Sequence, residues 1–422
     1  MTFESSLSFA KKMDEQDPLK GFRKKFLFPD FHKNEVIYFT GNSLGLQPVT
    51  TRQMILEELD DWGKFGVEGH FMSRRPWYSY HEQLTELSAY VVGAKPIETV
   101  VTHSLTTNIH LLMVSFYQPK GNRTKILCEK KAFPSDQYAL MSQLEFHGYD
   151  KEHLIEVGPR EGEETIRHED ILKAIQENKD ELALVFMGGV NYYTGQFFDL
   201  KEITNAGHEV GAIVGFDLAH AAGNVNLSLH DWGIDFATWC SYKYLNSSPG
   251  GVSGIYVHER HADNKGLKRF AGWWGHDKEQ RFLMEDQFVP IKGAEGWQLS
   301  NAPVLGMAAH LASLQIFKEA GMERIGSKRD LITAYLEYLI LKVSAENGNF
   351  LKIITPSSIF ERGSQLSLVL KKDGKKKFDL LTEQGIIADW REPNVIRIAP
   401  APLYNSFEDC WHFAEVLGRE VS

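Results

Sequence analysis

The chain has 422 residues, of which 43% are hydrophobic and 24% charged, as in an ordinary globular protein long enough for two domains. Its formal charge of −10 disfavours nucleic acid and anionic membranes as general partners. Cys128, Cys240 and Cys410 are widely separated and form no C-x-x-C pair, which argues against a disulfide framework or a zinc ribbon and for a reducing compartment. The first residues lack the apolar core of a signal peptide, and no apolar run reaches membrane-helix length, so we expect a cytoplasmic protein without a membrane partner.

The first hundred residues predict helices and a loop rather than a regular sheet. Residues 1–35 alternate charged and single apolar residues, which indicates one or two helices with a loop. Residues 36–40 are typical of a strand, and Gly41–Pro48 of a turn-rich loop. Helical periodicity covers Thr51–Phe65, and another helix is expected near Leu84–Val92.

From about residue 97 to residue 260, candidate strands alternate with candidate helices. This alternation predicts an α/β fold, with a mainly parallel sheet covered by helices on both faces. The candidate strands are Val100–Thr102, Thr124–Glu129, Leu182–Met187, Ala212–Phe216, Phe236–Cys240 and Ser253–Val257. The candidate helices are Thr107–Tyr117, Ser135–His147, His168–Gln176 and Asp199–Glu209.

The pattern changes after Val304 and predicts a small α+β domain. Two long helices come first, short strands follow, and Phe407–Leu417 forms a closing helix. The basic run Lys371–Lys377 is interpreted as a solvated hairpin or loop. The expected helices are Val304–Glu319 and Arg329–Ser344, and the expected strands are Leu351–Ile354, Gln365–Leu370 and Val395–Ile398.

Lys243 is the residue around which the chemistry of the chain is predicted to be organised. It precedes a run of small residues and follows Asp217, which ends an apolar strand, by 26 positions (243 − 217). Such a pair suggests pyridoxal phosphate, with the acid holding the pyridine nitrogen protonated and the lysine forming the Schiff base. A surface lysine beside a turn is the simpler alternative. Asp217 and His220 also resemble two metal ligands, but no third ligand or H-E-x-x-H pattern accompanies them, so we expect no metal.

Three further stretches leave a structural and a functional interpretation open. Ser104–Asn108 precedes a helix, where hydroxyl groups can cap the helix or its free N–H groups can bind a phosphate. Phe133 enters the next helix and either stacks on a flat ring or packs in the core, while Ser135 is expected to cap that helix. Arg397 lies in an apolar strand and requires an anion, either a substrate carboxylate or a structural salt-bridge partner.

Motifs along nearly the whole chain resemble those of kynureninase, a pyridoxal phosphate enzyme of the aspartate aminotransferase fold type (fold type I). The blocks Cys240-Ser-Tyr-Lys-Tyr-Leu-Asn and Phe216-Asp-Leu-Ala-His together are the most specific. The resemblance implies a three-layer large domain over residues 45–303 and a small C-terminal domain over residues 304–422, with residues 1–44 packing on the small domain. The other matching stretches are Thr40–Pro48, Arg75–Trp77, Ser104–Leu112, Phe133–Tyr138, Tyr193–Gln196, Gly272–His276 and Ala399–Phe407.

The resemblance also implies an activity: hydrolysis of the Cβ–Cγ bond of L-kynurenine or 3-hydroxykynurenine, in tryptophan catabolism or pyridine nucleotide biosynthesis. Lys243 would carry the pyridoxal phosphate, Asp217 would pair with its ring nitrogen, and Tyr242, tuned toward neutral pH by nearby cations, would act as general acid/base. A homodimer with active sites shared across the interface is implied as well. The implied cofactor-binding residues are Leu105, Thr106, Phe133, Pro134, Ser135, Asp136, Asp217, His220, Tyr242 and Lys243, with Trp273 and Asn301 from the partner subunit. The implied substrate-binding residues are Arg397, His70, Ser43, Ser300 and Asn301.

One position departs from the family pattern, and other functions compete with this interpretation. Gly188 falls where some relatives place a serine near the cofactor, so it is left out of the predicted site. Within the family, the combination of His70, Ser300 and Asn301 looks like that of members that prefer the 3-hydroxy substrate, and a polar site built for a hydroxyl discriminates against its absence. A cysteine desulfurase would need a mobile cysteine, for which Cys410 in a closing helix is a poor candidate. A non-catalytic amino-acid sensor would be expected to lack Lys243, Tyr242 or Arg397.

Overall fold

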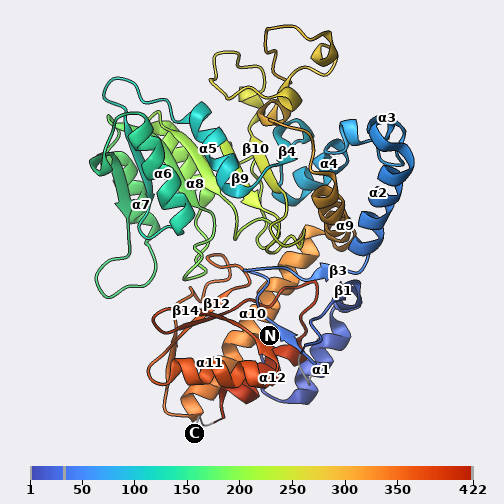
Figure 1. Ribbon diagram of the computed structural model, residues 1–422. Helices are drawn as coiled ribbons and strands as arrows, with labels where there is room; N and C mark the ends of the chain where they lie inside the picture. The colour runs from blue at the N-terminus through green and yellow to red at the C-terminus, as the bar shows by residue number, and fades with distance from the viewer. Residues whose placement is uncertain (1, 32–34, 420–422) are drawn as a thin grey trace.

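The computed structural model describes residues 2–31 and 35–419. Two sheets organise the molecule: a seven-stranded sheet in the upper part of Figure 1 and a four-stranded sheet in the lower part. Within the described residues, no helix is both long enough and apolar enough to cross a membrane.

The seven-stranded sheet has the order β4-β10-β9-β8-β7-β5-β6. The pairs from β9 to β6 are all parallel, whereas β10 runs antiparallel to both β9 and β4. The predicted mainly parallel sheet is therefore confirmed. The sequence did not predict β6, an edge strand whose residues are mostly only half-buried. The strands are β4 Thr99–Thr102, β5 Lys125–Glu129, β6 Leu154–Val157, β7 Leu182–Gly188, β8 Ile213–Asp217, β9 Phe236–Cys240 and β10 Ser253–Val257.

Helices cover both faces of this sheet, because alternate strand residues point into different cores. On β5, Ile126 and Cys128 pack with residues of α5 and α6, whereas Leu127 packs in the cluster that holds residues of α7 and α8. The result is the expected three-layer α/β arrangement. These helices are α5 Leu105–Phe116, α6 Pro134–Phe146, α7 His168–Glu177 and α8 Leu200–Glu209.

The four-stranded sheet is antiparallel and has the order β11-β12-β15-β14. The predicted loop at Lys371–Lys377 is wrong, because helix α11 begins within that run at Gly374. Leu381 of α11 is buried in the small core together with the stem of Lys377, whereas Lys375 and Lys376 are exposed and lie on the polar side of the helix. The strands are β11 Leu351–Ile353, β12 Leu366–Leu370, β14 Asp389–Arg391 and β15 Val395–Ile398, and the helices are α10 Met322–Glu346, α11 Gly374–Glu383 and α12 Phe407–Leu417.

The first fifty residues tie the two sheets together. Helix α1 packs on α12, and β2 pairs in parallel with β13 beside the small sheet. Helix α9 packs against α2 and α4. The two cores meet within α10, since Ile325 belongs to the large core and Ile332 to the small one; the boundaries at residues 44/45 and 303/304 stay a prediction. The elements are α1 Leu7–Gln16, β1 Phe26–Leu27, β2 Ile37–Tyr38, β3 Gln47–Pro48, α2 Thr51–Phe65, α3 Gly69–Met72, α4 Glu82–Val92, α9 Val304–Ala320 and β13 Ile386–Ile387.

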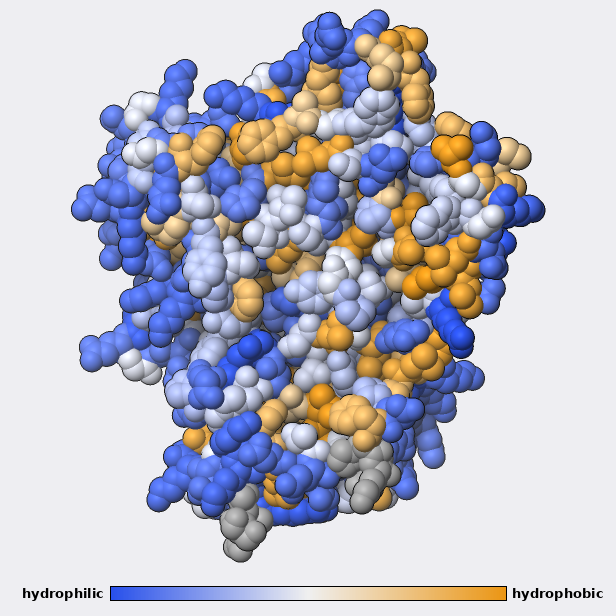
Figure 2. All heavy atoms as spheres, in the orientation of Figure 1, coloured by the Kyte–Doolittle hydropathy of each residue, from blue (hydrophilic) through white to orange (hydrophobic). Residues whose placement is uncertain are grey.

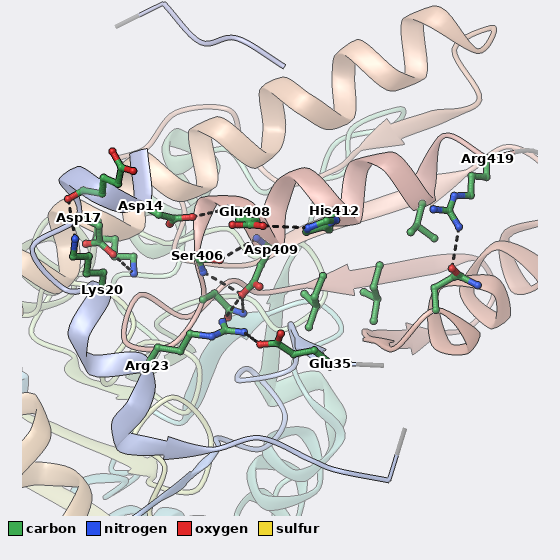
Figure 3. A pocket seen from close by; sticks show the side chains of 17 residues that line it. Asp14, Asp17, Lys20, Arg23, Glu35, Ser406, Glu408, Asp409, His412 and Arg419 are labelled. Carbon is green, nitrogen blue, oxygen red and sulfur yellow. Dashed lines mark hydrogen bonds and ion pairs between the residues drawn. The ribbon is translucent and has the colours of Figure 1, made fainter. Parts of the chain in front are cut away.

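A cavity of about 700 Å³ lies between the N-terminal segment and α12 (Figure 3). Charged side chains on its wall are largely paired with one another. Asp17 and Lys328 form a buried ion pair of 2.6 Å, and Arg23 contacts Asp409 at 2.7 Å. Asp14 accepts hydrogen bonds from two backbone N–H groups at the start of α12. The cavity wall is therefore a polar joint between the N-terminal segment and the small domain.

Candidate active site

A second cavity, of about 360 Å³, opens at the carboxyl ends of the large sheet. Glu129, Gly188 and Asp217 end the neighbouring strands β5, β7 and β8 and line its floor. Ligands of open α/β sheets bind at this edge. Nine predicted cofactor-binding residues line the cavity: Leu105, Thr106, Phe133, Ser135, Asp136, Asp217, His220, Tyr242 and Lys243.

Lys243 follows β9 and points its amine at His220. The distance from Lys243 Nζ to His220 Nε2 is 2.9 Å, and Nζ lies 5.8 Å from the centroid of the Phe133 ring. Burial, and next the charge of Lys243, hold the pKa of His220 well below its usual range, so the neutral ring accepts a hydrogen bond from the lysine. His220 Nδ1 is buried and has no hydrogen-bond partner among the described residues.

The Lys243 loop is held in place by the loop that follows β2. Gly45 N–H donates to the carbonyl of Tyr242 at 2.8 Å. A Cβ at Gly45 would lie only 2.4 Å from the carbonyl oxygen of Lys243, so a larger residue would push the two loops apart. The N-terminal motif that contains Gly45 therefore positions the loop that carries the lysine.

Three carboxyl groups share the cavity, and they cannot all carry a charge at neutral pH. Burial, and then the neighbouring Asp217 and Glu129, raise the pKa of Asp136 well above its usual range. Burial raises the pKa of Asp217 too, but Lys243 opposes this shift, and a hydrogen bond links Asp136 to Asp217. The charge of Lys243 therefore favours the negative charge on Asp217 and the proton on Asp136.

Glu129 is a site residue that the sequence interpretation missed. Burial raises its pKa to about 7, and its carboxyl oxygens each lie 3.1 Å from Gly188 N, which donates to them. A Cβ at Gly188 would lie 2.8 Å from Glu129 Oε1. The glycine, left out of the predicted site, lines the cavity and leaves room for Glu129. An acid at the end of an apolar strand, the signal that identified Asp217, was available for Glu129 as well.

Two helices, α5 and α6, begin at the cavity without a side-chain cap. No side chain caps α5, because Ser104 Oγ lies 3.0 Å from Thr107 Oγ1 instead. The predicted cap by Ser135 is wrong: its hydroxyl donates to Asp136 Oδ1 at 3.1 Å, and α6 has no side-chain cap. Uncapped helix starts carry partial positive charge and suit a phosphate.

Tyr242 does not have the lowered pKa that the sequence interpretation expected. Burial, and then the proximity of Cys240, raise the pKa of its phenol above the usual value of tyrosine. Lys243 Nζ lies 5.9 Å from the ring centroid and does not offset the burial. The phenol is therefore protonated at neutral pH, which fits a proton donor better than a base.

Arg397 lies on β15 beside the cavity and is 1% exposed. Its Nη1 donates to the carbonyl of Tyr192 at 2.5 Å, and Tyr192 lines the cavity. Its Nη2 pairs with Asp389 and lies 3.4 Å from Ser43 Oγ. The salt bridge is therefore present in the geometry, and Arg397 is connected to the cavity through the carbonyl of Tyr192.

Seven predicted site residues do not line the cavity of the same chain: Ser43 and Arg397, which lie beside it, and five others. His70 in α3 bonds the carbonyl of Val67 through Nδ1. Ser300 and Asn301 are exposed, Trp273 is 44% exposed and packs on Phe282, and Pro134 begins α6 without lining the cavity. Their assignment to the site, including the contribution of Trp273 and Asn301 across a dimer, stays a prediction.

The cavity fits pyridoxal phosphate. A buried carboxylate requires a positive partner such as a pyridinium nitrogen, and His220 Nδ1 is a buried polar atom that needs a partner. The uncapped start of α5 supplies donors for a phosphate. Lys243 and Phe133 provide an amine and an aromatic face in the same space.

Comparison with known proteins decides the family. The kynureninase of Flavobacterium johnsoniae is 56% identical over 422 residues, which cover 100% of this chain and 99% of that protein. The chain belongs to the kynureninase family. The family's enzymes from Myxococcus xanthus and Nematostella vectensis are 54% and 48% identical, with 98% of this chain and 97% and 93% of those proteins covered. Residues 328–417 match the Kynureninase C-terminal domain. The predicted resemblance is confirmed, and the chain is an enzyme.

Solved structures confirm the fold. A mutant of the cystine lyase C-DES, with glycine covalently linked to its PLP cofactor, superposes with a TM-score of 0.75 at 16% identity, over 92% of this chain and 99% of that one. The cysteine desulfurase of Thermococcus onnurineus gives 0.73 at 18% identity, over 94% and 97%. These likenesses show fold type I and nothing of the reaction. Cys410, the weak desulfurase candidate, is buried in α12.

Proposed function

We propose that this chain hydrolyses the Cβ–Cγ bond of L-kynurenine and 3-hydroxy-L-kynurenine, releasing L-alanine and anthranilate or 3-hydroxyanthranilate. The observation that carries the proposal is the 2.9 Å contact between Lys243 Nζ and His220 Nε2, in a cavity that Asp217 also lines. When bound there, pyridoxal phosphate supplies an electron sink that protein side chains lack.

Lys243 and Asp217 have the central roles in this proposal. The amine of Lys243 would hold the cofactor covalently, and as a free amine it would be the base that takes the Cα proton of the substrate. Asp217 holds a proton on the ring nitrogen, and its burial makes that pairing favourable for both groups. Phe133, with 41% of its surface exposed at the cavity, stacks on the ring.

Tyr242 is the proton donor of the cleavage step. Water adds to the γ-carbonyl carbon, the Cβ–Cγ bond breaks, and the aromatic acid leaves with the oxygen of water. Cβ of the alanine fragment then needs a proton. The protonated phenol of Tyr242 is available for this transfer, because burial raises its pKa.

The remaining cofactor contacts divide between the two subunits of a homodimer. The N–H groups at Leu105 and Thr106, the first residues of α5, bind the phosphate together with Trp273 and Asn301 of the partner subunit. Figure 2 supports an interface, since hydrophobic side chains gather over α2, α3 and the loop near residue 283. The exposed large hydrophobic residues there are Leu56, Leu59, Trp62, Val67, Phe71, Met72, Phe282, Leu283 and Met284.

Arg397 binds the α-carboxylate of the substrate, because a buried guanidinium forms a planar fork that matches a carboxylate. Ser43, 3.4 Å from Arg397 Nη2, lies at the same end of the substrate. His70, Ser300 and Asn301 surround the aromatic ring and favour its 3-hydroxyl group. The enzyme acts in the cytoplasm, in tryptophan catabolism or pyridine nucleotide biosynthesis.

Two measurements test the activity. Purified protein incubated with pyridoxal phosphate is expected to turn yellow and to release fluorescent anthranilate from L-kynurenine. Lys243→Ala should abolish both, whereas Lys173→Ala, at an exposed lysine of α7, should change neither. A protein that stays colourless, or that is yellow and releases no anthranilate, would contradict the proposal.

The substrate preference has its own test. The value of kcat/KM for 3-hydroxykynurenine should exceed that for kynurenine, because polar groups built for a hydroxyl are left unpaired without it. Replacing His70 by Phe should reduce the ratio of the two values. A higher kcat/KM for kynurenine in the unmodified enzyme would reject the preference and leave the reaction class intact.

A further inference from the structure

The carboxylate of Asp389 is paired with the guanidinium group of Arg397, which is proposed to bind the substrate. The two residues are direct partners in the antiparallel pair of β14 and β15. Directly opposite residues of a sheet project to the same face, so register alone brings the Asp389 carboxylate to Arg397. The contact joins Asp389 Oδ2 to Arg397 Nη2.

The same carboxylate oxygen has two other partners. Ser43 Oγ donates to Asp389 Oδ2 at 2.6 Å, and Arg391 Nη2 lies 3.3 Å from it. Arg391 follows Asp389 by two residues on β14, so both side chains lie on one face of the strand. Asp389 therefore lies within reach of two guanidinium groups, one buried and bonded to the cavity-lining Tyr192, and one 40% exposed.

The donors of Arg397 leave no free edge for a second carboxylate. Nη1 donates to the Tyr192 carbonyl, and Nη2 donates to Asp389 and Ser43. Nε is buried and without a partner among the described residues. A substrate carboxylate that takes the two-pronged geometry of arginine needs Nε together with Nη2. It can bind in that way only after Asp389 has left Nη2.

In the part of the chain that the structure describes, Arg391 and Arg397 share a single carboxylate partner. Arg391 and Arg397 carry two positive charges, and Asp389 is the one carboxylate that the structure pairs with either of them among its described residues. The nearby Glu392 accepts from Trp390 Nε1 instead. One added carboxylate would give each arginine its own acid.

We propose that Asp389 is an internal latch: it fills the carboxylate site of Arg397 when substrate is absent and moves to Arg391 when the substrate's α-carboxylate binds. The inference rests on the proposed role of Arg397 in substrate binding. The latch neutralises a buried arginine in the empty enzyme, which would otherwise carry an uncompensated charge. It also selects for ligands that carry a carboxylate, since only an anion can replace the ion pair that Asp389 forms with Arg397.

The test uses a ligand pair that binds without reacting. The probe 4-oxo-4-phenylbutanoate has the aryl ketone and the carboxylate but no amine, and 4-oxo-4-phenylbutanamide lacks the negative charge. Their dissociation constants are measured calorimetrically on the holoenzyme. Asp389→Asn should bind the carboxylate probe about fivefold more tightly and the amide probe unchanged, because the competing carboxylate is gone. Asp379→Asn, at an exposed acid of α11, is the matched control and should change neither constant.

Arg391→Gln provides a second arm that does not depend on the folding of the first variant. Without its receiving arginine, Asp389 should stay on Arg397, so the carboxylate probe should bind about fivefold more weakly. Tighter binding in Asp389→Asn together with weaker binding in Arg391→Gln supports the latch. Weaker or unchanged binding in Asp389→Asn overturns it and makes Asp389 a fixed support of Arg397. If Arg397→Lys leaves the affinity for the carboxylate probe unchanged, the proposed role of Arg397 fails and the latch fails with it.

Discussion

Lys243 Nζ and His220 Nε2 lie 2.9 Å apart at the carboxyl edge of the large sheet, and the imidazole is neutral because burial lowers its pKa. His220 therefore acts as an acceptor that orients the amine and keeps its remaining ring nitrogen available. The contact connects the strand that ends in Asp217 with the loop that carries Lys243. Cofactor retention should therefore depend on this pairing.

His220→Gln should weaken cofactor retention. The variant loses the ring nitrogen that accepts from Lys243 and the buried Nδ1–H donor, and a hydrogen bond lost at a buried site costs about tenfold in affinity. Equilibrium dialysis followed by absorbance of bound pyridoxal phosphate measures the change. His153→Gln, at a surface histidine, serves as control. Equal retention in both variants would show that His220 does not contact the cofactor.

Tyr242→Phe should slow turnover by about a hundredfold while it changes pyridoxal phosphate affinity little, because the phenol supplies a proton rather than cofactor binding energy. Because burial raises the pKa of Tyr242, the phenol should stay protonated near neutral pH. The rate of the unmodified enzyme should therefore not fall in this pH range through ionisation of Tyr242. Single-turnover kinetics with kynurenine are the measurement. Retained turnover would remove Tyr242 from the mechanism.

Glu129→Gln should change the pH dependence of stability. Burial raises the pKa of Glu129 from 4.5 to about 7, so the folded protein binds a proton that the unfolded chain releases between these values. The contribution of this group to the free energy of unfolding is complete below pH 4.5 and is lost as pH rises through 7. At high pH the free energy of unfolding of Glu129→Gln should therefore exceed that of the unmodified protein by about 2 kcal/mol. Urea unfolding of the cofactor-free proteins at pH 5 and pH 8 measures the difference. Glu152→Gln, at an exposed acid, should show no such change; a Glu129→Gln difference equal at both pH values would show that Glu129 is ionised throughout.

Breaking the ion pair at the polar joint should destabilise the fold. Lys328→Met leaves Asp17 buried without its cation, since the two side chains are 5% and 2% exposed and 2.6 Å apart. The expected loss in the free energy of unfolding is about 3 kcal/mol. Lys95→Met removes an exposed pair with Glu259 and should cost less than about 1 kcal/mol. Chemical denaturation compares them, and similar losses would mean that the Asp17–Lys328 pair is worth no more than a surface contact.

Much of the fold was predictable because apolar runs mark buried strands. Helix Thr51–Phe65, strand Phe236–Cys240 and helix Phe407–Leu417 have the predicted bounds. The missed elements lack that signal. Strand β6 is half-buried at the sheet edge, and the lysines that begin α11 conceal its apolar side.

The candidate site was predictable where a residue's place follows from the end of a strand, as for Asp217. Contacts that depend on strand register or on burial could not be predicted from the sequence. The pairing of Asp389 with Arg397 depends on the alignment of β14 with β15, which no local pattern specifies. The expected lowering of the Tyr242 pKa failed because the ring is more strongly desolvated than stabilised by charge. Glu129 could have been found from the sequence, since it ends its strand as Asp217 does.

The most direct test of the central claim is the identity of the lysine that carries the cofactor. Holoenzyme reduced with borohydride, digested and analysed by mass spectrometry should show a pyridoxyl phosphate group on the peptide that contains Lys243, and on no other peptide. The modification should be absent when the enzyme is saturated with kynurenine before reduction. Attachment to a different lysine, or no attachment in an active enzyme, would contradict the account.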